Sequence, residues 1–222
     1  MRRALFLPAK APRPGRTKTR LSPPLSLEQA ADLYRAFLQD CVALALDAGS
    51  DRVTVRFPSD DGAERELASL LPPTVCLQPE AVDDLGGILE GGFRRLLGEG
   101  FERVVVIGSD NPTLSPALVE AAWRGLDDHD VVIAPTADGG YCLLGMTRHH
   151  PALFERITWS TDAVYRETLE RARQQGLRVL TLPEGYDVDT VAELDRLRAD
   201  LATLPPSVAP ATRQALAGLS WP

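Results

Sequence analysis

Val104-Val105-Val106-Ile107-Gly108-Ser109-Asp110-Asn111-Pro112 joins an uninterrupted apolar run to a polar turn that contains glycine. A continuous run of β-branched residues is typical of a strand that is buried on both faces, as in a parallel sheet covered by helices. Open α/β sheets bind ligands at the carboxyl ends of their strands. Asp110 follows such an end, so this stretch predicts both a fold class and a candidate site.

Strand-like and helix-like segments alternate along the rest of the chain. The segments expected to form strands are residues 4–7, 53–57, 75–77, 104–107, 131–134, 141–145 and 177–182. Helical periodicity predicts helices over residues 27–48, from residue 115 onward, over 162–175 and over 190–201, with a weak helix at 211–216. This alternation favours an α/β fold, a mostly parallel mixed sheet flanked by helices. The 141–145 strand follows its predecessor after a short turn, so it either runs antiparallel or lies at a switch in the sheet.

Capping signals mark the ends of the predicted helices. Ser26 is an expected N-cap, with Gln29 completing a capping box and Gly49 ending the helix. Pro116 after Ser115 suits a first helical position, where its missing N–H is not needed. No linker divides the chain, so we expect one domain over residues 1–204 and a proline-rich tail over 205–222.

The composition is that of a globular protein, with 44% hydrophobic and 25% charged residues. No apolar run reaches the roughly 18 residues of a membrane span. Three cysteines, odd in number and far apart, fit neither a disulfide framework nor a zinc ribbon. We therefore expect a cytoplasmic protein without a membrane partner.

Charge is distributed unevenly along the sequence. Seven lysines and arginines precede Glu28, the first acidic residue, and the net charge is −7, so the remainder carries −14. An acidic body is a poor non-specific binder of nucleic acid, and no such partner is expected. The amino-terminal cations have no acid beside them in sequence, which predicts either an anion-binding loop or a solvated basic arm.

The cationic loop is Lys10-Ala11-Pro12-Arg13-Pro14-Gly15-Arg16-Thr17-Lys18-Thr19-Arg20-Leu21. Glycine permits close backbone approach, proline restricts the loop, and several cations could neutralise a polyphosphate. The loop matches neither the Walker pattern nor a Gly-x-Gly-x-x-Gly turn.

Two further turns combine carboxylates with strand ends. Asp138-Gly139-Gly140-Tyr141 follows the 131–134 strand and suits either an acceptor-binding turn with Asp138 as a base or a tight hairpin. Asp187-Val188-Asp189-Thr190 has strand-like alternation, which places both aspartates on one side.

The motifs together resemble known transferases. Lys10 followed by Lys18-Thr19-Arg20-Leu21 is similar to the amino-terminal signature of 2-phospho-lactate guanylyltransferases and related nucleotidyltransferases. The ordered set, which continues through Gly108-Ser109-Asp110, Asp138-Gly139-Gly140-Tyr141, Trp159-Ser160-Thr161 and Asp187-Val188-Asp189-Thr190, resembles small bacterial glycosyltransferase-like transferases. This resemblance covers residues 4 to about 198 and implies the GT-A, nucleotide-diphospho-sugar transferase-like, Rossmann-type fold.

The resemblance also implies roles for individual residues. Asp110 and Asp189 would hold Mg²⁺ or Mn²⁺, although each could instead cap a local turn or helix. The expected catalytic residues are Lys18, Arg20, Asp110 and Asp138. The expected nucleotide-binding residues are Pro8, Lys10, Gly15, Lys18, Thr19, Arg20, Gln78, Gly86 and Ser109. The expected acceptor-binding residues are Asp138, Gly139, Gly140, Tyr141, Trp159, Ser160 and Thr161.

The base-reading region departs from the family pattern. Gly87-Ile88 stands where relatives often carry a polar pair, so the sequence does not identify the base. Adjacent His149 and His150 point apart in any regular element and receive no role.

Three functions remain open. In nucleotidyl transfer, a small phosphorylated acceptor attacks a nucleoside triphosphate and pyrophosphate leaves. In glycosyl transfer, a nucleotide-sugar is the donor and Asp138 serves as base. The third possibility is nucleotide binding without turnover. Gly108 stands where glycosyltransferases of this fold carry the first carboxylate of Asp-x-Asp, and this gap, together with the cationic loop, favours nucleotidyl transfer.

Overall fold

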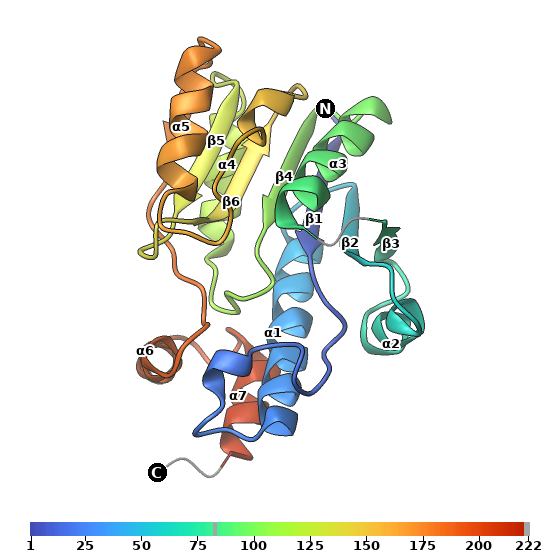
Figure 1. The fold of residues 1–222 in the computed structure, drawn as a ribbon, viewed down its shortest axis with the longest axis vertical. Helices are drawn as coiled ribbons and strands as arrows, with labels where there is room; N and C mark the ends of the chain where they lie inside the picture. Colours follow the sequence, from blue (N-terminus) through green and yellow to red (C-terminus); the bar gives the residue numbers. More distant parts are fainter. Residues whose placement is uncertain (82–83, 220–222) are drawn as a thin grey trace.

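The computed structural model of the chain describes residues 1–81 and 84–219. In this part, a seven-stranded sheet has the order β3-β2-β1-β4-β6-β5-β7 (Figure 1). The strands are β1 (Arg3–Pro8), β2 (Arg52–Pro58), β3 (Cys76–Glu80), β4 (Arg103–Ile107), β5 (Val131–Pro135), β6 (Tyr141–Met146) and β7 (Val179–Thr181). The α-helices are α1 (Leu27–Asp47), α2 (Ala63–Leu70), α3 (Leu85–Gly98), α4 (Pro116–Gly125), α5 (Val164–Gln174), α6 (Val191–Thr203) and α7 (Pro210–Ala217). Two short 3₁₀ helices, η1 (Thr19–Leu21) and η2 (Pro151–Leu153), complete the set of described elements.

The predicted fold class is confirmed. β1 pairs in parallel with β2 and β4, β2 with β3, and β5 with β7. β6 is antiparallel to both β4 and β5, which resolves the alternative left open for the strand after the short turn. The sheet is therefore mixed but mostly parallel, as the alternating pattern indicates.

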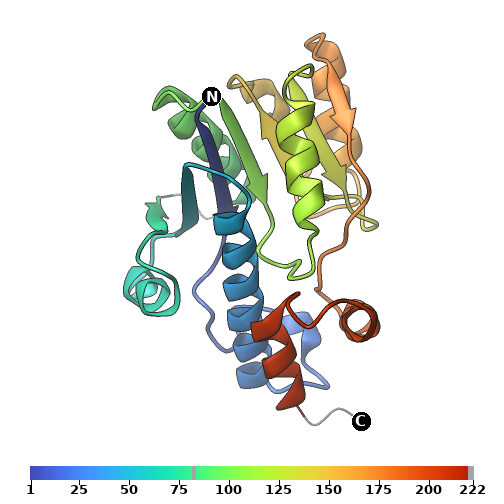
Figure 2. The same ribbon diagram turned by 180° about the vertical axis from the view of Figure 1, so that it is seen from behind.

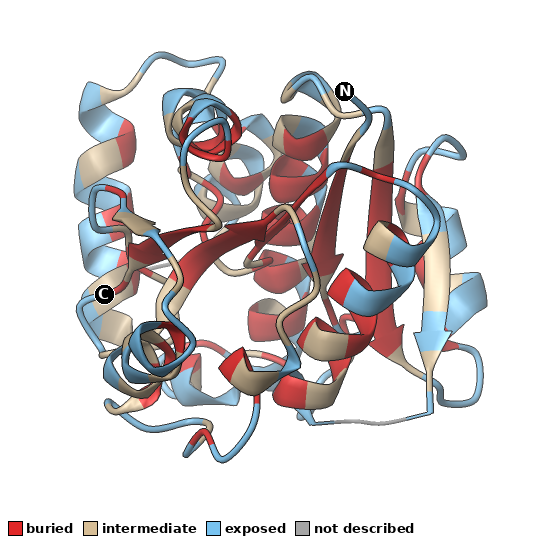
Figure 3. Ribbon diagram, turned by 90° about the horizontal axis from the view of Figure 1, so that it is seen from above, coloured by how far each residue is buried: buried red, intermediate tan, exposed pale blue. Residues whose placement is uncertain are grey.

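The alternation of side chains along β1 divides the core into two layers. Leu5 and Leu7 pack with buried residues of α1, α2 and α4 on one face of the sheet. Ala4 and Phe6 pack with α3, α5 and η2 on the other face. Figure 3 shows these buried residues along the strands and on the inward sides of the helices. Both faces of the sheet are thus covered, which explains the continuous apolar runs of its central strands.

Local capping follows the sequence signals. The Ser26 side chain accepts the backbone N–H of Gln29, and the Gln29 side chain accepts that of Ser26, so the capping box is formed. Gly49 has φ of +70°, a conformation that favours glycine beyond the end of α1. Ser115 caps α4 with Pro116 in its first turn.

Two helices have no counterpart among the predicted segments. α2 buries only Ala63 and Leu67, so its apolar pattern is weak. α3 is rich in glycine, which lowers helix propensity, yet packing requires glycine at some of these positions. A Cβ added at Gly92 would lie 2.6 Å from the Phe6 ring, so the helix approaches β1 closely. The sequence signal for α3 is therefore weakened by its own packing requirement.

The carboxyl-terminal helices complete a third cluster below the sheet. Leu33 and Phe37 of α1 pack with Leu194 and Leu197 of α6. Figure 2 shows α7 beside the lower half of α1. The buried carboxylate of Asp40 accepts the backbone N–H groups at the start of α7, at 3.1 Å from Ala211 and 2.7 Å from Thr212.

The segment predicted as a tail thus packs on α1 as far as Leu219, while residues 220–222 lie outside the described part. Among the described residues, no helix is both long and apolar enough to span a membrane.

The close approach of α3 to β1 gives a stability test. Gly92→Ala should lower the free energy of unfolding by about 1–3 kcal/mol, because the added methyl group collides with the buried Phe6 ring. Gly98→Ala in the same helix is the control, since nothing lies within 4 Å of its added Cβ. That variant should gain about 0.5 kcal/mol. Urea unfolding of both variants checks this, and equal stability of the two would contradict the packing argument.

Candidate functional site

A cleft of about 590 Å³ lies at the carboxyl ends of β1 and β4. Its walls come from the loop after β1, the start of α3, the turn after β4, the first residues of β6, the 159–160 segment and residues 187–189. Segments far apart in the chain therefore meet where open α/β sheets bind ligands.

Lys18 lies at the centre of this cleft. Its Nζ is 2.8 Å from Oδ1 of Asp110 and 2.7 Å from Oδ1 of Asp189. The Lys18 side chain is 4% exposed, whereas those of Asp110 and Asp189 are 35% and 39% exposed. Burial by itself would lower the pKa of Lys18, but the two carboxylates outweigh it and raise that pKa above its usual value. The structure thus brings the two predicted metal ligands together around one positive charge.

The backbone at Lys18 is held in an uncommon conformation. Its φ of 50° and ψ of 36° lie in the left-handed region, which costs an L-residue roughly 1–2 kcal/mol. Its carbonyl accepts the N–H of Leu21, so η1 begins directly after it. Thr19 and Arg20, which follow in η1, are exposed and do not line the cleft, and neither does Gly15. The turn that directs Lys18 inward therefore leaves these predicted nucleotide contacts outside the cleft.

Asp187 is a third carboxylate of the site, although the sequence analysis gave it no role. It lines the cleft as Asp189 does, while Val188 between them is fully buried, so the expected alternation is present. Its Oδ1 is buried without a hydrogen-bond partner among the described residues. Burial and then the negative charge of Asp110 raise the pKa of Asp187 to about 8. A carboxyl group that lines a cleft and has one buried oxygen without a partner is a candidate for a functional role.

A buried tyrosine supports the two loops that form the cleft. The hydroxyl of Tyr34 shares a hydrogen bond with Ser109 Oγ over 3.0 Å. It also accepts the backbone N–H of Lys10 over 3.2 Å. Tyr34 was missed because its position on the apolar side of α1 is equally typical of a core residue. It connects α1, the cationic loop and the turn after β4.

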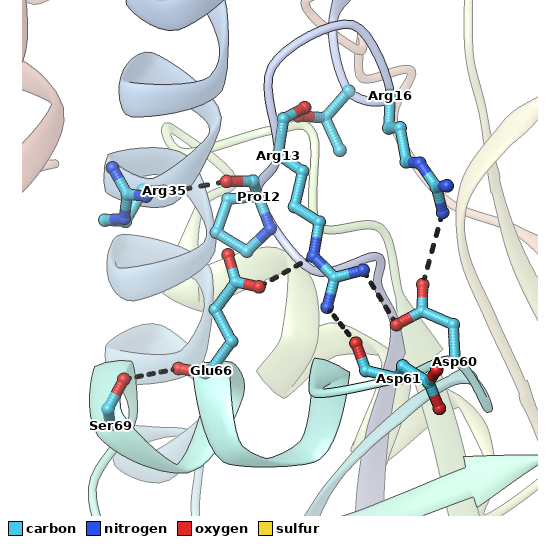
Figure 4. A network of polar contacts seen from close by, with 9 residues as sticks. Pro12, Arg13, Arg16, Arg35, Asp60, Asp61, Glu66 and Ser69 are labelled. Atoms are coloured by element: carbon cyan, nitrogen blue, oxygen red, sulfur yellow. Dashed lines mark hydrogen bonds and ion pairs between the residues drawn. The ribbon is translucent and has the colours of Figure 1, made fainter.

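Acidic residues that are distant in sequence lie against two of the amino-terminal arginines, Arg13 and Arg16, as Figure 4 shows. Arg13 pairs with Glu66 Oε2 at 2.8 Å and Asp60 Oδ1 at 2.9 Å, and donates to the carbonyl of Asp61 at 2.9 Å. Arg16 lies 3.6 Å from Asp60. These acids follow β2 in the sequence, but the fold places them against the loop. The lysines and arginines that line the cleft, within the described residues, are Lys10, Arg16 and Lys18.

The Asp138 turn is stabilised by its own polar groups. Asp138 Oδ1 accepts hydrogen bonds from Thr136 Oγ1 at 2.5 Å and from the backbone of Gly140 at 3.1 Å. Gly139 has φ of +87°, and an added Cβ would lie 2.2 Å from the carbonyl of Asp162. Asp138, Gly139 and Gly140 do not line the cleft. The hairpin interpretation accounts for the contacts of Asp138 with Thr136 and Gly140.

Other predicted ligand-binding residues divide into two groups. Those that line the cleft are Pro8, Lys10, Ser109, Tyr141, Trp159 and Ser160. Gly86 does not line it but lies against Trp159, because an added Cβ would be 2.4 Å from the indole nitrogen. Gln78 lies on edge strand β3 and donates to the carbonyl of Pro79, and Thr161 donates to that of Thr158. Neither Gln78 nor Thr161 lines the cleft.

The acidic residues of the cleft suit a shared metal site. In the part of the chain that the structure describes, no group of three acidic, histidine or cysteine side chains could hold a metal by itself. Two carboxylates that already share one cation fit an ion whose other ligands are phosphate oxygens and water, which is how Mg²⁺ is usually held.

Comparisons with known proteins agree with the resemblance noted in the sequence. The family model described as "Uncharacterized protein conserved in bacteria (DUF2064)" matches residues 41–161. A 2-phospho-L-lactate guanylyltransferase of Methanothermobacter thermautotrophicus is 33% identical over 183 residues, which are 81% of this chain and 78% of that protein.

Solved structures extend the match over nearly the whole chain. A crystal structure from Desulfovibrio desulfuricans G20, which carries the name nucleotide-diphospho-sugar transferase, has a TM-score of 0.89 and 31% identity. The match covers 98% of this chain and 96% of that one. A nucleotidyl transferase from Methanothermobacter thermautotrophicus shares the fold, with a TM-score of 0.62 at 18% identity, over 91% of this chain and 98% of that one.

The environment of Asp187 predicts a pH dependence of stability. In the unfolded chain this group loses its proton near pH 3.8, whereas in the folded protein it keeps the proton until about pH 8. Its stabilising contribution is therefore complete below about pH 4 and is lost as the pH rises toward 8.

Asp187→Asn removes this loss. As the pH rises from 5 to 8, the unfolding free energy of the variant should increase by at least about 1 kcal/mol relative to that of the parent protein. Urea unfolding in the presence of a chelator measures it. Asp195→Asn, an exposed position on α6 outside the cleft, is the control and should follow the parent profile. A constant difference between Asp187→Asn and the parent would contradict the assignment.

Proposed function

Since the chain belongs to the bacterial family DUF2064 and is homologous to a 2-phospho-L-lactate guanylyltransferase, we propose that it is a nucleotidyltransferase. It transfers a nucleotidyl group from a nucleoside triphosphate to a small phosphorylated acceptor and releases pyrophosphate. The observation that carries this proposal is that Asp110 and Asp189 share the Lys18 ammonium, in a cleft that Lys10 and Arg16 also line.

The metal ligands in this proposal are Asp110 and Asp189. The Lys18 ammonium stands in for a metal ion, since it lies within 2.8 Å of both carboxylates. Mg²⁺ or Mn²⁺, when bound there, would neutralise negative charge on the phosphates. Asp187, whose Oδ1 has no described partner, lies beside this pair and could accept a hydrogen bond from a water ligand.

Cationic side chains of the loop orient the triphosphate. A divalent ion held by Asp110 and Asp189 would free the Lys18 ammonium, which would then neutralise the phosphates. Lys10 is exposed and Arg16 is held only loosely by Asp60, at 3.6 Å, so both can reach an anion in the cleft. Arg13 keeps the loop in position through Asp60 and Glu66. The acceptor phosphate is already ionised near neutral pH, so the transfer needs no strong base.

A second candidate is glycosyl transfer from a nucleotide-sugar. The name carried by the Desulfovibrio relative favours it. The Asp138 carboxylate is hydrogen-bonded within its own turn. This argues against glycosyl transfer, because Asp138 was the expected base for an acceptor hydroxyl.

A cytoplasmic location is part of the proposal. Cys41, Cys76 and Cys142 are all free thiols, and two of them are buried. Absence of pairing among these cysteines agrees with a reducing compartment.

Competition binding distinguishes the two chemistries. If pyrophosphate is the leaving group, GTP, CTP, UTP or ATP should bind at least tenfold more tightly than the matching nucleotide-sugar, since the cleft cations then meet three phosphates. Calorimetry with Mg²⁺ measures the affinities. Consistently tighter binding of UDP- or GDP-sugars would favour glycosyl transfer instead.

The stand-in role of Lys18 predicts opposite effects on two ligands. Lys18→Met should bind Mn²⁺ at least tenfold more tightly in the absence of nucleotide, because the ion no longer displaces an ammonium from Asp110 and Asp189. The same variant should bind the triphosphate more weakly. Electron paramagnetic resonance of free Mn²⁺ measures the first effect, and Asp110→Asn, which should lose most of the affinity for Mn²⁺, is the comparison. Weaker Mn²⁺ binding by Lys18→Met would contradict the shared site.

A further inference from the structure

The positive charge of the cleft is confined to one wall. Lys10, Arg16 and Lys18 all come from the loop after β1, and they are the lysine and arginine side chains among the described residues that line the cleft; no histidine lines it. Val82 and Asp83, which lie outside the described part, carry no positive charge either. Among the described residues, an anionic group that enters the cleft therefore meets positively charged side chains only on this loop.

A second wall is apolar and aromatic. It consists of Leu85, Ile88, Leu89, Tyr141, Trp159 and Ser160. Trp159 closes onto the first turn of α3, because an added Cβ at Gly86 would lie 2.4 Å from its indole nitrogen. Tyr141 and Trp159 also pack against the core cluster that contains Leu89. The wall is therefore continuous with the packed core of the fold.

The cleft is lined by acidic residues as well as by the loop cations. Asp84, Asp110, Asp187 and Asp189 all line the cleft. Lys18 faces Asp110 and Asp189, Arg16 faces Asp60, and in the proposed reaction a triphosphate would engage these two cations together with Lys10. An acceptor carboxylate next to the apolar wall would meet negative charge and apolar surface, which together oppose its binding.

Polar groups on the apolar wall are neutral. Ser160 exposes its hydroxyl, and the Tyr141 hydroxyl is buried without a hydrogen-bond partner among the described residues. The partly exposed Trp159 presents a flat ring. A ligand with hydroxyl groups on one side and C–H groups on the other fits such a surface, because ligand pockets combine apolar contact area with a few oriented polar groups.

We propose that the acceptor is a phosphate monoester whose remaining part is uncharged, carries hydroxyl groups and has an apolar face, and is not a phosphorylated carboxylic acid. This inference rests on the proposed nucleotidyl transfer. An oxygen of the acceptor phosphate forms a bond to the α-phosphorus, and the bond from that phosphorus to the bridging β-oxygen breaks. Pyrophosphate leaves with the electron pair, and no oxidation or reduction takes place.

The experiment compares two acceptors of equal phosphate charge. Hexose 1-phosphates (glucose, galactose and mannose) represent the uncharged class, and 2-phospho-L-lactate represents the carboxylic acids. Pyrophosphate release is followed with each of the four nucleoside triphosphates and Mg²⁺. We expect kcat/KM to be at least tenfold higher for a hexose 1-phosphate. Equal or faster turnover of 2-phospho-L-lactate would overturn the acceptor class while leaving nucleotidyl transfer intact.

Two matched leucines test the charge argument. Leu85 and Leu27 are each the first residue of a helix and are 43% and 41% exposed, but Leu85 lines the cleft and Leu27 does not. Leu85→Lys adds a cation beside the apolar wall and should raise the preference for 2-phospho-L-lactate at least fivefold. Leu27→Lys should leave the preference unchanged. Equal preferences in the two variants would count against the proposal.

Binding resolves the case in which neither acceptor gives pyrophosphate. Calorimetry with the Mg²⁺-bound, non-hydrolysable triphosphate then compares a hexose 1-phosphate with 2-phospho-L-lactate. Tighter binding of the hexose 1-phosphate supports the acceptor class if its affinity falls in Trp159→Ala and is retained in Trp159→Phe. In that case nucleotidyl transfer itself has failed. Tighter binding of 2-phospho-L-lactate, or binding of neither compound, overturns the inference.

Discussion

The site depends on the repulsion between carboxylates that the fold gathers at one edge of its sheet. Asp110 follows β4, and Asp187 and Asp189 return to the same edge from the far end of the chain. Two unit charges about 4 Å apart interact with about 4 kcal/mol at an effective dielectric constant of 20. Repulsion of this size requires either a cation or a proton. The structure uses both, since Lys18 bridges Asp110 and Asp189 while the raised pKa of Asp187 favours its protonated form.

This constraint also explains how the cations of the amino-terminal loop are divided. Arg13 is paired with two carboxylates and a carbonyl outside the cleft, so its charge is used to hold the loop. Lys18 is paired within the cleft, where its partners are also the residues suited to a metal. Arg16 lies between these cases, with one long contact to Asp60. A single cationic segment thus contains residues that position the loop and residues that are available to a ligand.

Much of the fold could be predicted from the sequence because its signals are local. The central strands are continuous apolar runs, and Ser26 with Gln29 fixes the start of α1 through contacts three residues apart. α3 could not be predicted in the same way, because Gly92 is required by contact with Phe6, a residue far away in sequence. The pairing of Arg13 with Glu66 is also non-local, so the sequence around the loop did not reveal it. Asp110 and Asp189 were identified through motifs, whereas Tyr34 and Asp187 needed three-dimensional neighbours to be distinguished from core and cap residues.

The same physical picture connects the metal to the substrate. Asp110, Asp189 and Lys18 together carry a charge of −1, so a divalent ion in place of Lys18 would neutralise both carboxylates and leave the lysine charge for a ligand. In the proposed reaction, a triphosphate would supply the compensating negative charge and additional oxygen ligands, which no third acidic, histidine or cysteine side chain of the described residues provides. Each ligand therefore improves the site for the other, and this reciprocity follows from thermodynamic linkage alone. The apolar wall at Trp159 contributes nothing to this charge balance, which leaves it free to select the acceptor by shape and by the absence of charge.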